Sequence, residues 1–337
     1  MTRGDEVRAF EQAFAEYVGA KYAIALCNGT ATLHTALLAL GVQPGDCVAV
    51  PPLTMASTTI AVLHAGAVPV FVDVDPRTWL IGDGIDGLHT VPNCAAFIAV
   101  SLYGLHQPHV GTALIDDAAQ TLRRHSGAAF TSYSFQASKI LALGEGGMLV
   151  TDDEAMATRA REYSSLGYRL RADQPRIDPA ALKAPTYARH HRLGWNYRMN
   201  DLTAAEGLRQ LEQAPRLLAA RHVAARMYQE ALRGCAWLTP QHVPDGWTHD
   251  YWAYPVAVSD VAVEHLADRI VAAGGERPYA AWRLTYQEPA FRPMAPDGTC
   301  PVAEDLQPRL LQFQTNDLPR AEQNAHALTH AIREIGG

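Results

Sequence analysis

The sequence predicts an α/β protein built on a mainly parallel sheet of seven strands, with helices on both faces. Seven short apolar runs fall within the first 151 residues, at 22–26, 47–50, 68–71, 95–100, 113–115, 129–135 and 148–150. Most of these runs are continuous rather than alternating, which is typical of strands buried on both faces of a parallel sheet. Ligands of such sheets bind in loops at the strand ends, so we expect the functional site there.

Helices are predicted on either side of the first strand. Apolar residues at 7, 10, 14 and 18 recur at helical spacing and stop at Gly19. A second set at 33, 37, 38 and 40 stops before Pro44. Because Asn28-Gly29-Thr30 separates the first apolar run from the second helix, this region is predicted to be a strand-turn-helix unit.

A smaller second domain is predicted after the sheet. Residues 201–232 are rich in Ala, Leu, Arg, Glu and Gln, which indicates one long helix, or two joined at Pro215, bridging to that domain. Beyond Gly246 the sequence predicts an extended segment at 251–258, a helix at 261–273, a Pro-rich stretch up to 301 and a last helix at about 320–335. We therefore expect a large domain, residues 1–212, and a small C-terminal α+β domain, residues 213–337.

The composition excludes several classes of protein. With 337 residues, 48% of them hydrophobic and 19% charged, the chain can bury a substantial core, which excludes a disordered or fibrous protein. Lys and Arg number 28 against 35 Asp and Glu, so no overall positive field would gather nucleic acid or an acidic membrane. No apolar run approaches the roughly 18 residues that span a bilayer, and the opening residues are charged, so we expect a cytoplasmic protein.

The cysteines and histidines predict neither a disulfide framework nor a metal site. The five cysteines lie at wide, unrelated spacings without a Cys-x-x-Cys pair, and none has an obvious histidine partner that would favour a catalytic thiol. The fourteen histidines are scattered, and only His190 and His191 are adjacent. We therefore expect no bound metal.

A lysine follows a buried strand in the segment 134–139, and a glycine-rich turn comes next at 144–147. Small and hydroxyl residues flank Lys139, which is a poor setting for a merely solvated charge. A lysine held in a pocket can lose its proton and form an imine with an aldehyde. The alternative is an ordinary lysine at the end of a strand.

Two further features accompany this lysine. Asp116 and Asp117 end an apolar strand, where a buried carboxylate needs a cationic partner such as a pyridinium nitrogen, or else one of them caps the following turn. Gly29 and Thr30 open a helix, where backbone N–H groups and a hydroxyl suit a phosphate, or form an ordinary cap. Ser134 is a further candidate donor. Together, these features fit pyridoxal 5'-phosphate (PLP).

The order of the motifs resembles that of the DegT-type (StrS-like) sugar aminotransferases, which are PLP-dependent enzymes of fold type I. The matching segments are 10–32, 44–46, 70–75, 116–120, 134–147 and 194–199. The resemblance covers about residues 4–232 well and the remainder loosely. It implies a large cofactor-binding domain and a homodimer whose active site is shared between the subunits.

The resemblance also implies a role for each matching residue. Lys139 would hold the cofactor covalently and, once displaced, carry a proton from one carbon to another. Asp117 would pair with the pyridine nitrogen, and Gln120 would lie near the ring hydroxyl. The other cofactor-binding residues would be Gly29, Thr30 and Ser134 at the phosphate, Met55 and Ala119 in the pocket, and Asn196 from the neighbouring subunit.

Three departures from the family pattern are visible. Met55 stands where the family usually has an aromatic ring stacked on the cofactor, so we expect weaker cofactor binding. The chain starts near the first motif helix, without the preceding segment that in the family contributes to the substrate mouth and the dimer. Only ten residues separate Gly104 from Ile115, so a helix usual at that point is expected to be missing.

A basic segment precedes Asn196. Between Tyr168 and Arg198, Asp173 and Asp178 face seven cations, which are Arg169, Arg171, Arg176, Lys183, Arg189, Arg192 and Arg198. Such a segment suits an anionic substrate, either a nucleotide-diphosphate sugar or a carboxylate, or it is only a solvated loop. Arg192 and Arg198 are the candidate substrate-binding cations. Tyr197 is a candidate for stacking on a base or sugar, or for packing at an interface.

The resulting hypothesis is an aminotransferase that moves an amino group from glutamate or glutamine to a ketone on a sugar, free or nucleotide-linked, or on a cyclitol, in a biosynthetic pathway. One alternative is a PLP-dependent lyase or dehydratase on the same fold. The family's sugar dehydratases replace the lysine with histidine, so Lys139 favours transamination. The other alternative is a non-catalytic ligand-binding or sensor protein.

Overall fold

The computed structural model describes residues 4–81, 94–106, 114–125, 127–168, 180 and 183–336. Its largest sheet has seven strands in the order β1-β8-β7-β6-β4-β2-β3. These strands are β1 (Tyr22–Leu26), β2 (Cys47–Val50), β3 (Val68–Phe71), β4 (Cys94–Val100), β6 (Leu114–Asp117), β7 (Phe130–Ser134) and β8 (Gly147–Thr151). Four neighbouring pairs are parallel, and β8 runs antiparallel to both β7 and β1. The predicted α/β fold with a mainly parallel sheet is confirmed.

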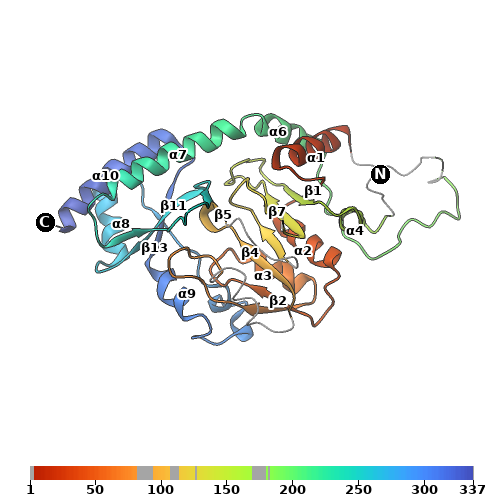
Figure 1. The fold of residues 1–337 in the computed structure, drawn as a ribbon, viewed down its shortest axis with the longest axis horizontal. Helices are drawn as coiled ribbons and strands as arrows, with labels where there is room; N and C mark the ends of the chain where they lie inside the picture. The colour runs from red at the N-terminus through yellow and green to blue at the C-terminus, as the bar shows by residue number, and fades with distance from the viewer. Residues whose placement is uncertain are drawn as a thin grey trace.

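Helices cover both faces of this sheet, as Figure 1 shows. On one face α2 packs against α3 and α4 over an aliphatic core, and on the other face α1 packs against α6. Phe14 of α1 meets the ring of Tyr133 on β7 at a centroid distance of 4.9 Å. Burial on both faces is the reason why the strand segments are continuous apolar runs. The helices are α1 (Asp5–Val18), α2 (Gly29–Leu40), α3 (Ser57–His64), α4 (Glu154–Ser164) and α6 (Asp201–Leu211).

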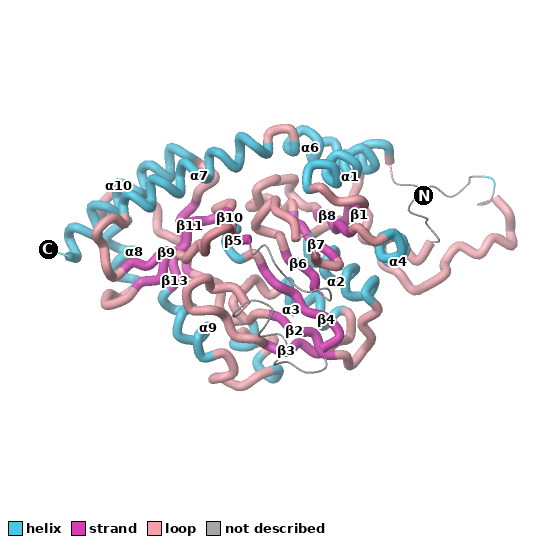
Figure 2. Tube along the Cα trace, in the orientation of Figure 1, coloured by secondary structure: helices cyan, strands magenta, loops and turns pink. Residues whose placement is uncertain are grey.

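A second, antiparallel sheet of four strands follows, in the order β12-β13-β11-β9. Figure 2 shows β9, β11 and β13 near one another at the left of the view. One face packs against α7, α8 and α10, and the other face, through Ala253 and Ala257, packs against Tyr103 and Leu105 of the larger unit. The strands are β9 (Leu238–Pro240), β11 (Ala253–Val258), β12 (Tyr279–Ala280) and β13 (Leu310–Gln314), and the helices are α7 (Ala214–Ala231), α8 (Val263–Ala272), α9 (Pro301–Leu306) and α10 (Leu318–Gly336).

The segment predicted as one long helix or two is two helices, α6 and α7. Pro215 lies in the first turn of α7, where its missing N–H breaks no helical hydrogen bond. Helix α7 contributes buried residues to two hydrophobic cores. Ala214 packs in the core that contains α1, and Tyr228 packs in the core of the four-stranded sheet. The proposed boundary between residues 212 and 213 falls in the short turn between the two helices.

A two-stranded sheet joins the two parts of the chain. β5 (Leu105–His106) pairs with β10 (Thr248–His249), next to the short 3₁₀ turn Leu102–Gly104. Residues 107–113 lie outside the described residues, so the expected loss of a helix there is not decided. None of the helices in the described ranges combines the length and hydropathy that crossing a bilayer requires.

Candidate active site

A cavity of about 510 Å³ opens where β4, β6 and β7 end and α2 begins. It brings together residues that lie far apart in the sequence, from Asn28 to Trp282. All the predicted cofactor-binding residues except Asn196 line it, namely Gly29, Thr30, Met55, Asp117, Ala119, Gln120, Ser134 and Lys139. Thr54, Glu145, Trp252 and Trp282 also line the cavity.

Lys139 lies in the turn that follows β7. Its backbone N–H donates to the carbonyl of Gln136 at 2.8 Å, and the N–H of Ala137 donates to the carbonyl of Gly144 at 3.0 Å, which fixes the turn. Burial lowers the pKa of the Lys139 ammonium, against the opposing charge of Asp117. The amine therefore loses its proton more readily than a solvated lysine, as a nucleophile requires.

Asp117 is the last residue of β6 and is only 5% exposed. Its carboxylate accepts hydrogen bonds from the Thr58 hydroxyl at 2.9 Å and from the Ala119 N–H at 3.2 Å. Burial raises the pKa of Asp117, while these hydrogen bonds and the charge of Lys139 lower it. Two neutral donors do not neutralise a buried carboxylate, so the site suits a cationic group such as a protonated ring nitrogen.

The start of α2 approaches the end of β7 closely. The side chain of Asn28 caps the helix by accepting from the Ala31 N–H at 2.8 Å. A Cβ atom on Gly29 would lie 2.8 Å from the Cβ of Ser134, so only glycine permits this approach. The free N–H groups of the first helical turn and the hydroxyls of Thr30 and Ser134 meet at the cavity. Such a cradle fits a phosphate group.

Gln120 and Met55 occupy different parts of the cavity wall. Gln120 is buried, and its side-chain oxygen accepts from the Tyr103 N–H at 2.5 Å. This bond ties the end of the Asp117 motif to the 3₁₀ turn after β4. Met55 is 50% exposed at the cavity mouth. The thioether is thus available to pack on a ring that enters the cavity.

Two tryptophans from the second half of the chain complete the wall, and the sequence motifs did not predict them. The Nζ of Lys139 lies 4.9 Å from the centroid of the Trp252 ring. Trp252 donates from its indole N–H to the Ser138 carbonyl at 2.7 Å and stacks on Trp282 at 5.9 Å between centroids. Both residues belong to the part of the chain where the resemblance is loose. Their aromatic character alone did not separate them from core residues.

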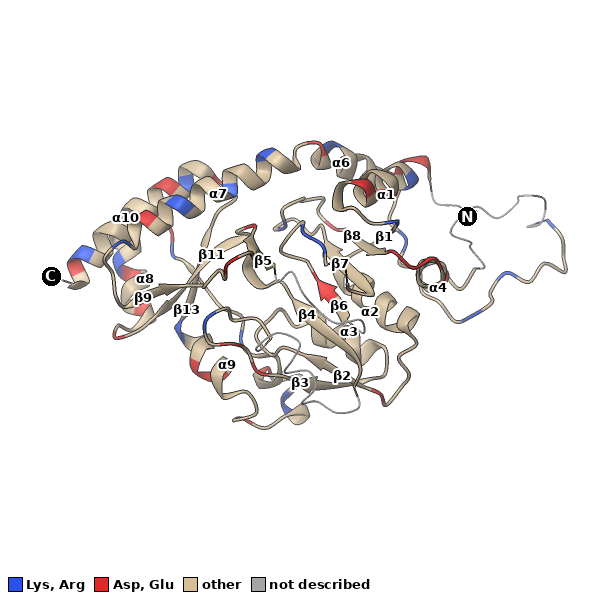
Figure 3. Cartoon of the chain, in the orientation of Figure 1, with Lys and Arg blue, Asp and Glu red and all other residues tan. Residues whose placement is uncertain are grey.

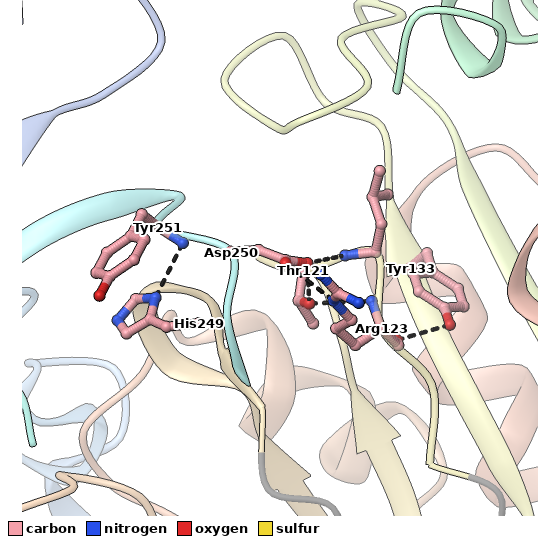
Figure 4. Close-up of polar contacts among 7 residues, drawn as sticks. Thr121, Arg123, Tyr133, His249, Asp250 and Tyr251 are labelled. Carbon is pink, nitrogen blue, oxygen red and sulfur yellow. Dashed lines mark hydrogen bonds and ion pairs between the residues drawn. The ribbon is translucent and has the colours of Figure 1, made fainter. Parts of the chain in front are cut away.

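Asp250 links the segment that precedes Trp252 to the segment that follows Gln120, and Figure 4 shows its contacts with Thr121 and Arg123. This carboxylate is fully buried and accepts hydrogen bonds from the Thr121 hydroxyl at 2.6 Å and the Leu122 N–H at 3.0 Å. Arg123 forms an ion pair with it at 3.0 Å. The segment just after Gln120 is thereby linked to the segment just before Trp252.

The four remaining candidates lie away from the cavity of their own chain. Asn196 is exposed, and its backbone bridges to Ser165. Arg192 forms an ion pair with Glu162 at 2.6 Å, and Arg198 donates to the Ser165 hydroxyl at 3.4 Å. The hydroxyl of Tyr197 bonds to Nδ1 of His34 at 3.1 Å, and its ring stacks on Trp195 at 6.2 Å. Their predicted contribution to a neighbouring subunit stays a prediction.

The loop that carries these residues is basic. Lys183, Arg189 and Arg192 are described, and Figure 3 shows positive charges along this loop at the right of the view. No acidic residue occurs between positions 183 and 200. Arg169, Arg171 and Arg176 lie outside the described residues.

Comparison with known proteins identifies the family of the chain. The sequence profile of the DegT/DnrJ/EryC1/StrS aminotransferase family matches residues 1–327. The chain belongs to this family. It is therefore an aminotransferase whose cofactor is PLP, as the motifs predicted. Both the resemblance and the fold type are confirmed, and the non-catalytic alternative is not supported.

Two relatives and one solved structure illustrate the similarity. The GDP-perosamine synthase of Caulobacter vibrioides is 36% identical over 270 residues, which cover 74% of this chain and 68% of that protein. The spore coat polysaccharide biosynthesis protein SpsC of Bacillus subtilis is 34% identical over 277 residues, covering 77% and 70%. The aminotransferase structure from Psychrobacter cryohalolentis is 27% identical, with a TM-score of 0.86 over 99% of this chain and 93% of that one.

Proposed function

We propose that this aminotransferase moves an amino group from glutamate or glutamine to a ketone carbon of a sugar, free or nucleotide-linked, or of a cyclitol, in a biosynthetic pathway. The observation that carries the proposal is the convergence of Lys139 and Asp117 on one cavity, where each affects the ionisation of the other. The names of the relatives, a GDP-perosamine synthase and a polysaccharide biosynthesis protein, support a sugar acceptor.

The residues of the cavity fit PLP. Gly29, Thr30 and Ser134 form a cradle for its phosphate, Asp117 offers the anion that keeps its ring nitrogen protonated, and Lys139 offers the amine that links to its aldehyde. When bound, PLP would carry the amino group and withdraw electrons from the carbon that loses a proton. Lys139 Nζ would hold that proton and move it from one carbon to the other, because its lowered pKa makes the free amine available as a base.

The walls of the cavity indicate how a substrate is held. Trp252 and Trp282 present a stacked aromatic pair, and the C–H faces of a sugar or cyclitol ring pack well on such surfaces. Among the lining residues that the structure describes, Lys139 is the one cation, and Glu145 adds a negative charge. A substrate carboxylate or diphosphate therefore needs a cation from elsewhere.

A homodimer with shared active sites supplies that cation. Arg198 is the better candidate, because its one described side-chain contact is a long hydrogen bond to Ser165, whereas Arg192 is already paired with Glu162. Asn196, two residues earlier, is exposed and would reach the partner's phosphate cradle. All five cysteines are free thiols, which supports the proposed cytoplasmic location. The formal net charge of -7 supports no role for nucleic acid or an acidic membrane as a partner.

Absorption spectroscopy of the purified enzyme tests the proposal. The wild type should be yellow from lysine-bound cofactor, and glutamate or glutamine should bleach this band as the amino group moves onto the cofactor. Panels of keto-sugars and keto-cyclitols should then restore the band. Lys139→Ala should lack the band, while Lys21→Ala, an exchange of a surface lysine outside the cavity, should keep it. A Lys139→Ala spectrum identical to that of the wild type would refute the assignment.

A further inference from the structure

A second cluster of functional side chains lies on the opposite face of β6 from the active site. Asp116 and Asp117 are adjacent in the strand, so their side chains point to opposite faces of the sheet. Asp117 lines the cofactor cavity. Asp116 instead meets His106 from β5 and His125 from the loop after Gln120.

The three side chains are buried and close together. Their exposed fractions are 6% for His106, 1% for Asp116 and 2% for His125. Each offers one nitrogen or oxygen atom that could coordinate an ion, and these atoms lie within 4.8 Å of one another. The two imidazole rings are 4.3 Å apart between centroids. Within the described part of the chain, Asp116 Oδ2 and His106 Nδ1 have no hydrogen-bond partner.

We propose that His106, Asp116 and His125 bind a divalent transition-metal ion, best suited to Zn²⁺. A buried carboxylate oxygen without a hydrogen bond is costly, and a dication beside it removes that cost. Two imidazoles and one carboxylate form a common zinc ligand set, whereas Mg²⁺ and Ca²⁺ prefer oxygen ligands alone. Ligand atoms around a tetrahedral zinc ion lie roughly 3.4 Å apart, so small side-chain rotations complete the site.

One oxygen of the Asp116 carboxylate already has a partner, because Oδ1 accepts a hydrogen bond from the Ser101 hydroxyl at 3.4 Å. The other oxygen, Oδ2, has no hydrogen-bond partner among the described residues, and neither has Nδ1 of His106. These two atoms are therefore available to coordinate an ion.

None of the three residues lines the cofactor cavity, so an ion bound there would take no part in the transfer of the amino group. An ion there would tie β5 and β6 to the loop that ends at His125. That loop begins directly after Gln120, and its first three residues hold Asp250. On the face of β6 opposite the cofactor cavity, the metal would thus restrict the movement of the strand that carries Asp117.

Metal analysis of the full-length enzyme, purified without a metal-affinity tag, tests the proposal. We expect about one zinc ion per chain to survive dialysis, and Co²⁺ exchanged into the site to show visible absorption bands of a nitrogen- and oxygen-ligated ion. His125→Gln and Asp116→Asn should lower the zinc content at least tenfold. His330→Gln, which changes an exposed histidine on α10, should leave it unchanged.

A second measurement keeps the test decisive if a ligand variant folds poorly. Wild-type enzyme stripped by a chelator should lose melting temperature and regain it with Zn²⁺ but not with Mg²⁺. The proposal is overturned if the wild type is free of metal and neither binds Zn²⁺ nor gains stability from it. Zinc retained in full by the variants would also overturn it. The yellow cofactor band reports the active site separately, so failure here leaves the aminotransferase assignment intact.

Discussion

Exchange of Gly29 for alanine tests the close approach between α2 and β7. The new Cβ would lie 2.8 Å from the Cβ of Ser134 and 3.2 Å from its Oγ, against ordinary contacts of at least 3.4 Å. The start of the helix therefore has to move by roughly half an ångström, and overpacking of this kind costs about 1–3 kcal/mol. We assign this cost to the enzyme with PLP bound, because the phosphate has to accept hydrogen bonds from the N–H groups of α2 and from the Ser134 hydroxyl at the same time.

The expected result is a weaker hold on the cofactor. At about 1.4 kcal/mol per tenfold, 1–3 kcal/mol corresponds to a rise of roughly 5- to 140-fold in the dissociation constant of PLP. Fluorescence or absorbance titration of apoenzyme with PLP measures this constant directly. The melting temperature of the apoenzyme should fall less than the full overpacking cost implies. Without PLP the start of α2 can move away from Ser134, and alanine is a better helix former than glycine.

A double exchange separates the steric reason from other causes. Ser134→Gly removes the atoms that the new Cβ would meet, at the loss of one hydroxyl. Added to Ser134→Gly, Gly29→Ala should therefore cost less than it does in the wild type. Gly336→Ala, at a position with open space around it, serves as the control. Native PLP affinity in Gly29→Ala would refute the reasoning that the start of α2 holds the phosphate.

Four further predictions concern the same site. Asp117→Asn should retain PLP but slow turnover roughly 100-fold or more in steady-state assays, and near-normal rates would contradict its pairing with the ring nitrogen. Burial lowers the pKa of Lys139, so the rate at which apoenzyme captures PLP should rise with pH and become constant below pH 10.5, the ordinary lysine pKa. Stopped-flow rates that still rise at pH 10.5 would contradict the lowered pKa. Trp282→Leu should raise KM for the ketone acceptor several-fold and leave the cofactor spectrum unchanged, whereas Trp282→Phe should retain most of the affinity. Equal increases of KM in the two variants would argue against stacking of the acceptor ring on Trp282. Mixing inactive Lys139→Ala with inactive Asn196→Ala should restore activity through hybrid dimers, and a mixture without activity would count against a shared site.

The sheet could be predicted because its strands are encoded locally. β1, β2 and β3 have the predicted bounds, since each is a continuous apolar run closed by turn residues. The direction of β8 could not be predicted in this way. A parallel and an antiparallel strand buried on both faces have the same apolar pattern, and only pairing with β7 and β1 distinguishes them.

Part of the candidate site could also be predicted from local sequence, like the strands of the sheet. Gly29, Asp117 and Ser134 each stand at the end of a strand or the start of a helix, and Lys139 lies in the turn that follows β7. The ends of parallel strands meet at one edge of a sheet, so these residues come together there. Trp252 and Trp282 were not predicted, because they reach the cavity only when the second sheet packs against the first. No spacing along the chain reports such packing.

The sequence by itself determined the fold class, the family and most of the residues that gather at the candidate site, because each of these depends on short segments with their own hydrophobic pattern or motif. Only the tertiary structure showed which residues far apart in the sequence are in contact. Asp250 meets Thr121 across 129 positions, and the expectation of no bound metal now stands against the cluster of His106, Asp116 and His125. Such contacts follow from how buried surfaces pack in three dimensions, and burial is a property of the whole fold rather than of any one segment.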